Sequence, residues 1–164
     1  MIQIGLLSDT HGFIDDRLFT FFDKCDEIWH AGDIGGLETA RKLSVFKPLR
    51  AVFGNIDDHH TRLEFLEELH FIVENTSVFI THIGGYPGNY APGIKNKLKQ
   101  IAPKIFIAGH SHILKVIYDK PFDLMFLNPG AAGNNGFHKV KTALRFAIDG
   151  DKLRNMEIWE SPRG

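Results

Sequence analysis

The sequence repeats one local pattern, a short apolar run that ends in glycine or in a polar cluster. These runs are rich in β-branched and aromatic residues, which is typical of buried strands. The runs cover residues 2–7, 27–29, 49–53, 78–80 and 105–107. Because helical patterns separate several of them, we expect strands and helices to alternate up to about His112.

Four helices are predicted, and the first has an apolar stripe at i, i+3, i+4 and i+7, formed by Leu18, Phe21, Phe22 and Cys25. The other three cover residues 37–46, 61–69 and 94–102. After His112 the sequence predicts strands without helices between them, at 116–118, 124–127, 142–148 and 153–159. Asp149-Gly150 predicts a hairpin turn between the last two strands. The whole pattern indicates two packed sheets with helices outside, in one domain covering residues 1–164.

Composition excludes several classes of function. The formal net charge of -1 gives no general attraction to nucleic acid or to acidic membranes. We expect no signal peptide and no membrane span, because no apolar run is long enough. The single cysteine, Cys25, precludes an intrachain disulfide and fits a reducing cytoplasm. The unusual feature is nine histidines, whose positions matter more than their number.

Metal-binding side chains follow each of the five apolar runs. Ligands of open α/β sheets bind beyond the carboxyl ends of the strands, so we expect these side chains to meet at one such edge. They are Asp9 and His11, then Asp33, Asn55, His82, and finally His110 and His112. Crowded carboxylates and imidazoles would repel and desolvate one another unless a cation lay between them. Zinc, iron and manganese all suit this set of ligands.

The spacing and the number of these ligands favour a pair of ions. Residues i and i+2 of an extended segment point to the same side. Asp9 with His11, and His110 with His112, can therefore aim at a common site or serve two neighbouring ions. Seven ligands are too many for one tetrahedral ion with an open position. They suit two ions with one bridging carboxylate.

The motifs in which these residues stand resemble the signature of the calcineurin-like metallophosphoesterases. Asp9-x-His11, Gly32-Asp33, Gly54-Asn55, His82 and Gly109-His110-Ser111-His112 occur in the order of that signature. The match covers residues 1 to about 130, and the small size is similar to the cap-less bacterial and archaeal phosphodiesterase branch. The fold class that we expect is a four-layer α/β/β/α sandwich with two mixed β-sheets flanked by helices.

The resemblance also implies a role for each ligand. Asp9, His11 and His112 would hold one divalent ion; Asn55, His82 and His110 would hold the other; Asp33 would bridge them. The ions would be Mn²⁺, Zn²⁺, Fe²⁺ or Ni²⁺, and a metal-bound hydroxide would attack phosphorus. Asn55 also counts as catalytic, because this neutral ligand adds no charge that opposes a phosphate anion.

The sequence departs from the family pattern at the expected acid. Many relatives carry histidine directly after Gly-Asn, where this chain has Ile56. Asp57 or His59 could donate the proton instead, or both could simply begin a helix, as we expect of Asp58 and His60.

Two loops are candidates for substrate contact. Residues 84–90, directly after His82, either form a plain crossing loop or place Tyr86 and Tyr90 to stack on an organic group of the substrate. The family's Asn-Pro-Gly-Ser turn reads Asn-Pro-Gly-Ala at 128–131 here, so any contact of that serine hydroxyl is lost. Residues 132–138 are either a long turn or a loop at the edge of the substrate site.

The leading hypothesis is a metal-dependent phosphodiesterase that hydrolyses a small phosphate ester. A phosphomonoesterase with the same site is one alternative. Another is a non-catalytic protein-binding scaffold, since a subunit of the eukaryotic retromer coat resembles this fold and acts mainly through protein contacts. The complete set of ligands favours the enzyme. The oligomeric state, including a homodimer, stays open.

Overall fold

The computed structural model describes residues 1–163 and contains two five-stranded sheets and a small hairpin. The first sheet has the order β12-β11-β1-β2-β3. Its strands are β1 (Ile2–Leu7), β2 (Glu27–His30), β3 (Leu49–Ala51), β11 (Val140–Asp149) and β12 (Lys152–Pro162). The strands β1, β2 and β3 run parallel to one another, whereas β11 is antiparallel to both β1 and β12. This sheet is therefore mixed.

The second sheet has the order β4-β5-β8-β10-β9 and is mixed in the same way. Its strands are β4 (Glu68–Val73), β5 (Thr76–Thr81), β8 (Ile105–Ile107), β9 (Leu114–Asp119) and β10 (Leu124–Pro129). The strands β5, β8 and β10 are parallel, and β4 and β9 run antiparallel at the two edges. A two-stranded hairpin, β6 (Gly85–Tyr86) with β7 (Asn89–Tyr90), lies between β5 and the last helix.

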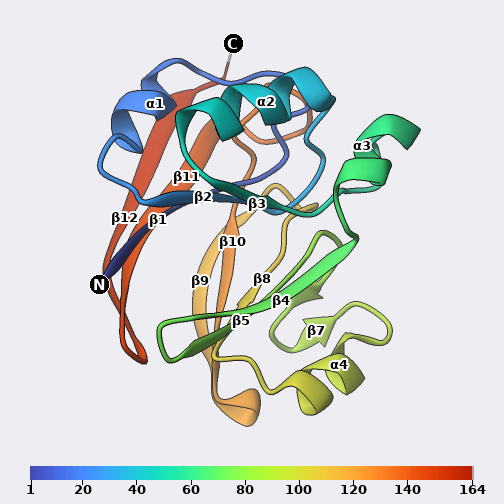
Figure 1. The fold of residues 1–164 in the computed structure, drawn as a ribbon. Coiled ribbons are helices and arrows are strands. Elements are labelled where there is room, and N and C mark those ends of the chain that lie inside the picture. Colours follow the sequence, from blue (N-terminus) through green and yellow to red (C-terminus); the bar gives the residue numbers. More distant parts are fainter. Residues whose placement is uncertain (164) are drawn as a thin grey trace.

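Helices cover the outer face of each sheet (Figure 1). The first sheet carries α1 (Arg17–Phe21) and α2 (Leu37–Phe46), and the second carries α4 (Ile94–Ile101). A short helix, α3 (His59–Glu64), connects β3 to β4, and a 3-10 turn, η1 (Lys120–Phe122), connects β9 to β10. This is the four-layer α/β/β/α arrangement with two mixed sheets that the sequence predicts.

The apolar core has three layers because the strands alternate their side chains between two faces. Between the sheets, Ile4 and Leu6 of β1 pack with Trp29 of β2 and with side chains from the opposite sheet. Leu7 of the same strand points outward to Leu18 of α1. On the other side of the molecule, Ile94 and Leu98 of α4 pack on Phe79, Phe106 and Phe126. Within residues 1–163 no helix combines the length and apolarity needed to cross a bilayer.

Several predicted elements are confirmed with their bounds, including α2 and β8, and the turn at Asp149-Gly150 joins β11 to β12. The helix predicted for residues 61–69 is wrong. Instead, Asp58 caps α3 with a hydrogen bond from the Thr61 amide, the helix ends at Glu64, and residues 68–73 form β4. Leu69, Phe71 and Val73 alternate along β4 and pack into the core between the sheets, which is a strand period rather than a helical one.

Candidate metal centre

The predicted metal ligands lie in loops at the carboxyl ends of five strands. Asp9 and His11 follow β1, Asp33 follows β2, and Asn55 follows β3. His82 follows β5, and His110 and His112 follow β8. We expected the ligands to share the edge of one sheet. The strands β1, β2 and β3 belong to one sheet, however, and β5 and β8 belong to the other. The ligands therefore lie where the ends of two sheets meet.

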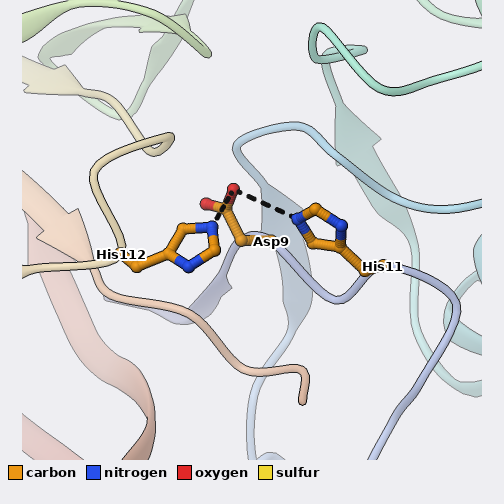
Figure 2. Close-up of side chains that lie close together, drawn as sticks. All are labelled: Asp9, His11 and His112. Carbon is orange, nitrogen blue, oxygen red and sulfur yellow. Dashed lines mark ion pairs between the residues drawn. The ribbon is translucent and has the colours of Figure 1, made fainter. Parts of the chain in front are cut away.

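The first group of ligand atoms belongs to Asp9, His11 and His112, whose candidate ligand atoms all lie within 4.8 Å of one another. Asp9 Oδ1 is 3.8 Å from His11 Nε2 and 3.2 Å from His112 Nε2. Figure 2 shows the two imidazoles on either side of this carboxylate. The Asp9 side chain is completely buried, and the two rings are largely so. This arrangement leaves room for an ion that one carboxylate and two imidazoles surround.

The second group consists of Asp33, His82 and His110, again with candidate ligand atoms within 4.8 Å of one another. Asp33 Oδ2 lies 3.1 Å from His82 Nε2, and it also lies 3.5 Å from His11 Nε2 of the first group. The rings of His82 and His110 meet edge to face with centroids 5.3 Å apart. Asp33 thus stands between the two groups, which is the position that a bridging carboxylate requires.

The backbone of the ligand loops is unusual. Asp9, His11, Asp33, His110 and His112 all have positive φ angles, between 48° and 70°. Among residues 1–163 only nine non-glycine residues have positive φ, so most of them lie in this site. Left-handed conformations are costly for residues with a Cβ atom, and such strain is found mainly at functional sites. These loops are therefore not extended, and the expected i, i+2 alternation does not explain how the ligands point.

The ligand loops are also tightly packed against one another. A Cβ atom at Gly54, next to Asn55, would lie 2.1 Å from Asp33 Oδ1, so only glycine fits there. Asp33 Oδ1 accepts a hydrogen bond of 3.0 Å from the Ile56 amide. The loops after β2 and β3 are thus closely joined.

Asp57 holds the same two loops together. Its buried carboxylate accepts hydrogen bonds from the backbone amides of Ile34, Gly35 and Gly54, at 3.1, 2.9 and 2.8 Å. Three amide hydrogen bonds to one carboxylate hold the two loops in a fixed relation. The structure thus gives Asp57 a supporting role in the site, and its role as a proton donor stays a prediction.

Electrostatics inside the centre are dominated by the carboxylate and imidazole pairs. Burial alone would raise the pKa of Asp9, but the neighbouring imidazoles of His11 and His112 outweigh this effect and lower that pKa. Burial would also raise the pKa of Asp33, but the neighbouring His82 lowers it, and the net result is a decrease. The neighbouring Asp9 carboxylate raises the pKa of His11. Burial lowers the pKa of His82, yet Asp33 and Asp9 more than reverse this. The site thus stabilises positive charge at its centre.

Three buried polar atoms test whether a metal fits. Within residues 1–163, Asp9 Oδ1, His11 Nε2 and His82 Nε2 have no hydrogen-bond partner. His82 Nδ1 lies 2.7 Å from the Ala31 carbonyl, which can only accept, so Nδ1 carries a proton. In the neutral ring, Nε2 then turns a lone pair toward Asp33, and only a proton or a cation between them removes the repulsion. The side chains therefore suit divalent metal ions.

The other residues that we predicted for the site are more widely distributed. Asn55 is exposed and lines a cleft that also includes His82 and Arg62. His59 is exposed at the start of α3, with its ring 6.0 Å from that of His60. Tyr86 is partly exposed, with the Lys115 ammonium 4.1 Å above its ring.

Tyr90 packs into the second sheet. Its ring packs against Phe106, Phe122 and Phe126, and its hydroxyl donates a 2.5 Å hydrogen bond to Asp119. The expected stacking of Tyr90 on a substrate group is corrected by this placement, because both the ring and the hydroxyl are already engaged in the second sheet.

His138 contacts the centre, although nothing in the sequence pattern distinguishes it. Its Nδ1 lies 3.2 Å from Nδ1 of His112, and its Nε2 lies 2.7 Å from the Gly133 carbonyl. The contact joins residues 26 positions apart, so spacing along the chain gives no sign of it. The only available hint is the large number of histidines. His30 is a buried ring bonded to Thr10 and to the Gly32 amide.

The chain combines two candidate metal-ligand groups with the fold of a known superfamily. Residues 2–151 match the model of the calcineurin-like phosphoesterase superfamily domain. The chain belongs to that superfamily. No curated protein matches the sequence.

Several solved structures share the fold. Vps29 from Entamoeba histolytica, complexed with Zn²⁺, aligns with a TM-score of 0.77 and 17% identity, covering 98% of this chain and 99% of that one. A Streptococcus pneumoniae protein described as a predicted phosphoesterase gives 0.70 and 22%, covering 99% and 98%. An archaeal phosphodiesterase gives 0.73 and 19%, covering 96% and 100%. At these identities the likeness shows the fold alone.

Proposed function

We propose that the protein is a binuclear metal-dependent phosphodiesterase. The observation that carries this proposal is the pair of ligand groups joined by Asp33, whose Oδ2 lies within 3.5 Å of imidazole nitrogens from both groups. Family membership supports the phosphoesterase class. A solved structure with the same fold is described as an archaeal phosphodiesterase, and on that likeness we propose a diester rather than a monoester as the substrate.

In this proposal each ion has its own ligands and shares one carboxylate. Asp9, His11 and His112 would hold the first ion, His82 and His110 would hold the second together with Asn55, and Asp33 would be the shared ligand. The chemistry that such a pair of ions would supply is a water of lowered pKa and stabilisation of charge on the phosphoryl oxygens. Mn²⁺, Zn²⁺, Fe²⁺ and Ni²⁺ are all compatible with imidazole and carboxylate ligands.

The protein's own contribution is to orient the ligands and to exclude competing arrangements. The Ala31 carbonyl fixes the ring of His82 through its Nδ1 proton, so that Nε2 faces the carboxylates. Asp57 fixes the loops that carry Asp33 and Asn55. Ile56 is exposed beside Asn55, so no imidazole at that position protonates a leaving group. We therefore expect turnover to fall steeply as the leaving group becomes more basic.

The decisive experiment measures metal content and hydrolysis on the same protein. Metal-depleted protein is loaded separately with Mn²⁺, Zn²⁺, Fe²⁺ or Ni²⁺ and given bis(p-nitrophenyl) phosphate or p-nitrophenyl phosphate. We expect two bound ions and faster hydrolysis of the diester. Asp33→Asn should lose the shared ligand and the activity, whereas His70→Leu, a matched change at an exposed histidine of β4, should lose neither. Bound metal without turnover of either ester would refute the proposal.

A preference for the monoester in the same assay would identify the alternative, a phosphomonoesterase. A protein-binding scaffold is the second candidate, because the Vps29 structures share the fold over almost the whole chain. The scaffold predicts stable complexes with a partner and no hydrolysis by any metal-loaded form.

We propose a cytoplasmic location, since the single cysteine is buried and unpaired. Light scattering of the purified protein decides between monomer and homodimer.

A further inference from the structure

Two clefts each include side chains of the candidate metal centre, and their linings differ. One includes Asn55 and His82, with the charged side chains of Arg62 and Glu67. The other includes His110 and His112, with Ile113 and Phe137 as its large apolar side chains. The rings of His82 and His110, one from each lining, have centroids 5.3 Å apart, and a phosphodiester carries two organic groups on one phosphorus atom, so two such clefts can accommodate both groups.

The apolar cleft is unusual because its hydrophobic side chains are left in water. Ile113 is 56% exposed and Phe137 is fully exposed. Ile113 directly follows a ligand, and Phe137 directly precedes His138, which contacts that ligand. Isolated exposed apolar residues need no explanation, but two of them lining one cleft beside a cluster of charged ligands do.

The loop that carries Phe137 is fastened to the ligand loop. His138 contacts His112 through the two Nδ1 atoms, at 3.2 Å, and the rings meet edge to face with centroids 5.0 Å apart. Gly136 lies so close that a Cβ atom there would be 2.3 Å from His112 Nδ1. The Arg163 guanidinium donates hydrogen bonds to the carbonyls of Gly136 and His138. The backbone around Phe137 is therefore fixed by these contacts, while its side chain is exposed to solvent. Less conformational entropy of this loop is lost when a ligand binds.

We propose that the cleft beside His112, with Ile113 and Phe137 as its apolar walls, binds an apolar or aromatic organic group of the phosphate ester that the protein hydrolyses. This inference rests on the proposed function, because the phosphoryl group must lie at the metal centre for its substituent to reach the cleft. The second substituent then faces Arg62 and Glu67 and is polar. The substrate class is therefore an unsymmetrical phosphodiester with one apolar and one polar organic group.

Phosphonates test the cleft without hydrolysis, because their carbon–phosphorus bond is not an ester. We compare the binding of phenylphosphonate and methylphosphonate to the metal-loaded protein by calorimetry. Burial of a phenyl ring in the apolar cleft should make phenylphosphonate bind about tenfold more tightly. Methylphosphonate has only a methyl group to place there and serves as the internal reference.

Substitutions then locate the preference. Phe137→Ser and Ile113→Ser should each reduce the preference for phenylphosphonate, and the double variant should abolish it, whereas Phe137→Leu should retain most of it. Val45→Ser is the matched control, because Val45 is an apolar side chain of α2 that is 87% exposed and does not line either cleft. Phe137 and Ile113 are exposed, so both can be changed without disturbing the core.

The outcomes separate the two proposals. Equal binding of the two phosphonates, or a preference that survives in the double variant, overturns the inference while diester hydrolysis still supports the proposed function. Failure of both phosphonates to bind, together with no hydrolysis, sinks the proposed function itself. A change of oligomeric mass in Phe137→Ser with an unchanged preference would show that these side chains serve a protein interface instead, and would also overturn the inference.

Discussion

His138 Nδ1 lies 3.2 Å from Nδ1 of His112, so two imidazoles share one hydrogen bond beside the candidate metal centre. The Gly133 carbonyl near His138 Nε2 can only accept a hydrogen bond, so Nε2 carries the proton of the neutral ring. His138 Nδ1 can therefore accept a hydrogen bond from Nδ1 of His112. Nε2 of His112 is then left with its lone pair toward Asp9. An outer ring of this kind fixes the tautomer of a metal ligand.

His138→Leu should accordingly weaken metal binding without removing a ligand. Loss of such an outer-sphere partner costs about 10- to 100-fold in metal affinity, which calorimetric titration of the metal-depleted protein measures. His138→Gln, whose side-chain oxygen can accept from His112, should recover part of the loss. The control is His70→Leu, because the His70 ring is hydrogen-bonded to Ser77 on the neighbouring strand and belongs to neither candidate ligand group. Unchanged affinity in His138→Leu would show that the contact with His112 is incidental.

Metal binding should release protons. The neighbouring Asp9 carboxylate raises the pKa of His11. Burial would lower the pKa of His82, but the attraction of Asp33 and Asp9 exceeds this effect and raises that pKa too. In the metal-free protein the rings of His11 and His82 are therefore partly protonated at neutral pH, and a bound ion must displace these protons. Metal affinity should fall as pH is lowered from about 8 to 6. Titrations in two buffers of different ionisation enthalpy should give different heats; identical heats would mean that both rings are neutral beforehand.

The sequence predicted which side chains lie together in the two candidate ligand groups, because these residues are tied to strand ends. Asp9, Asp33 and His82 each follow an apolar run, and the carboxyl ends of parallel strands are where ligands gather. It could not predict how the loops turn, since the positive φ of Asp9 and Asp33 depends on packing between loops. The same limit applies to His138, whose contact with His112 is purely tertiary.

The fold shows the same division between local and long-range information. The helix α2 and the strand β8 follow from periodicity within their own residues. The error at residues 61–69 arose because the apolar residues there fit both a helix and a strand. Pairing of Leu69 with Ile80 and of Phe71 with Val78 settles the matter in favour of β4. The pairing with β5 decides the outcome, and β5 lies outside the residues on which the local prediction was based.

Asp57→Asn should destabilise the protein and loosen the metal centre. Both carboxylate oxygens of Asp57 accept from the amides of Ile34, Gly35 and Gly54. Asparagine has only one acceptor oxygen, because its other polar atom is a donor nitrogen. Hydrogen bonds to an ionised group contribute about 1.5–3 kcal/mol each. We expect a loss of about 2–3 kcal/mol in the free energy of unfolding, measured with urea, together with weaker metal binding.

The adjacent change Asp58→Asn is the control for Asp57. Asp58 caps α3 by accepting from the Thr61 amide, and asparagine caps helices about as well as aspartate. Its stability and metal affinity should therefore match the wild type. If Asp57→Asn instead kept full stability and full metal content but lost the high-pH limb of its activity profile, Asp57 would be the acid after all.

The stability of the metal-free protein should depend on pH through His30. This buried ring accepts a hydrogen bond from the Gly32 amide and donates one to Thr10, which donates in turn to the Ile34 carbonyl. Burial lowers the pKa of His30 to about 4 from the ordinary 6.5. The folded state therefore binds the proton less readily than the unfolded state. The contribution of His30 to stability is complete above pH 6.5 and is lost as pH falls toward 4.

A difference of this size in pKa corresponds to about 3 kcal/mol at full effect. Other histidines also titrate in this range, so the measurement compares wild type with His30→Gln, which can still accept and donate. Urea unfolding of both metal-free proteins from about pH 8 to 4.5 should show the wild type losing stability faster than the variant below pH 6.5. Parallel curves would mean that His30 is protonated equally in the folded and unfolded chains and would contradict the prediction.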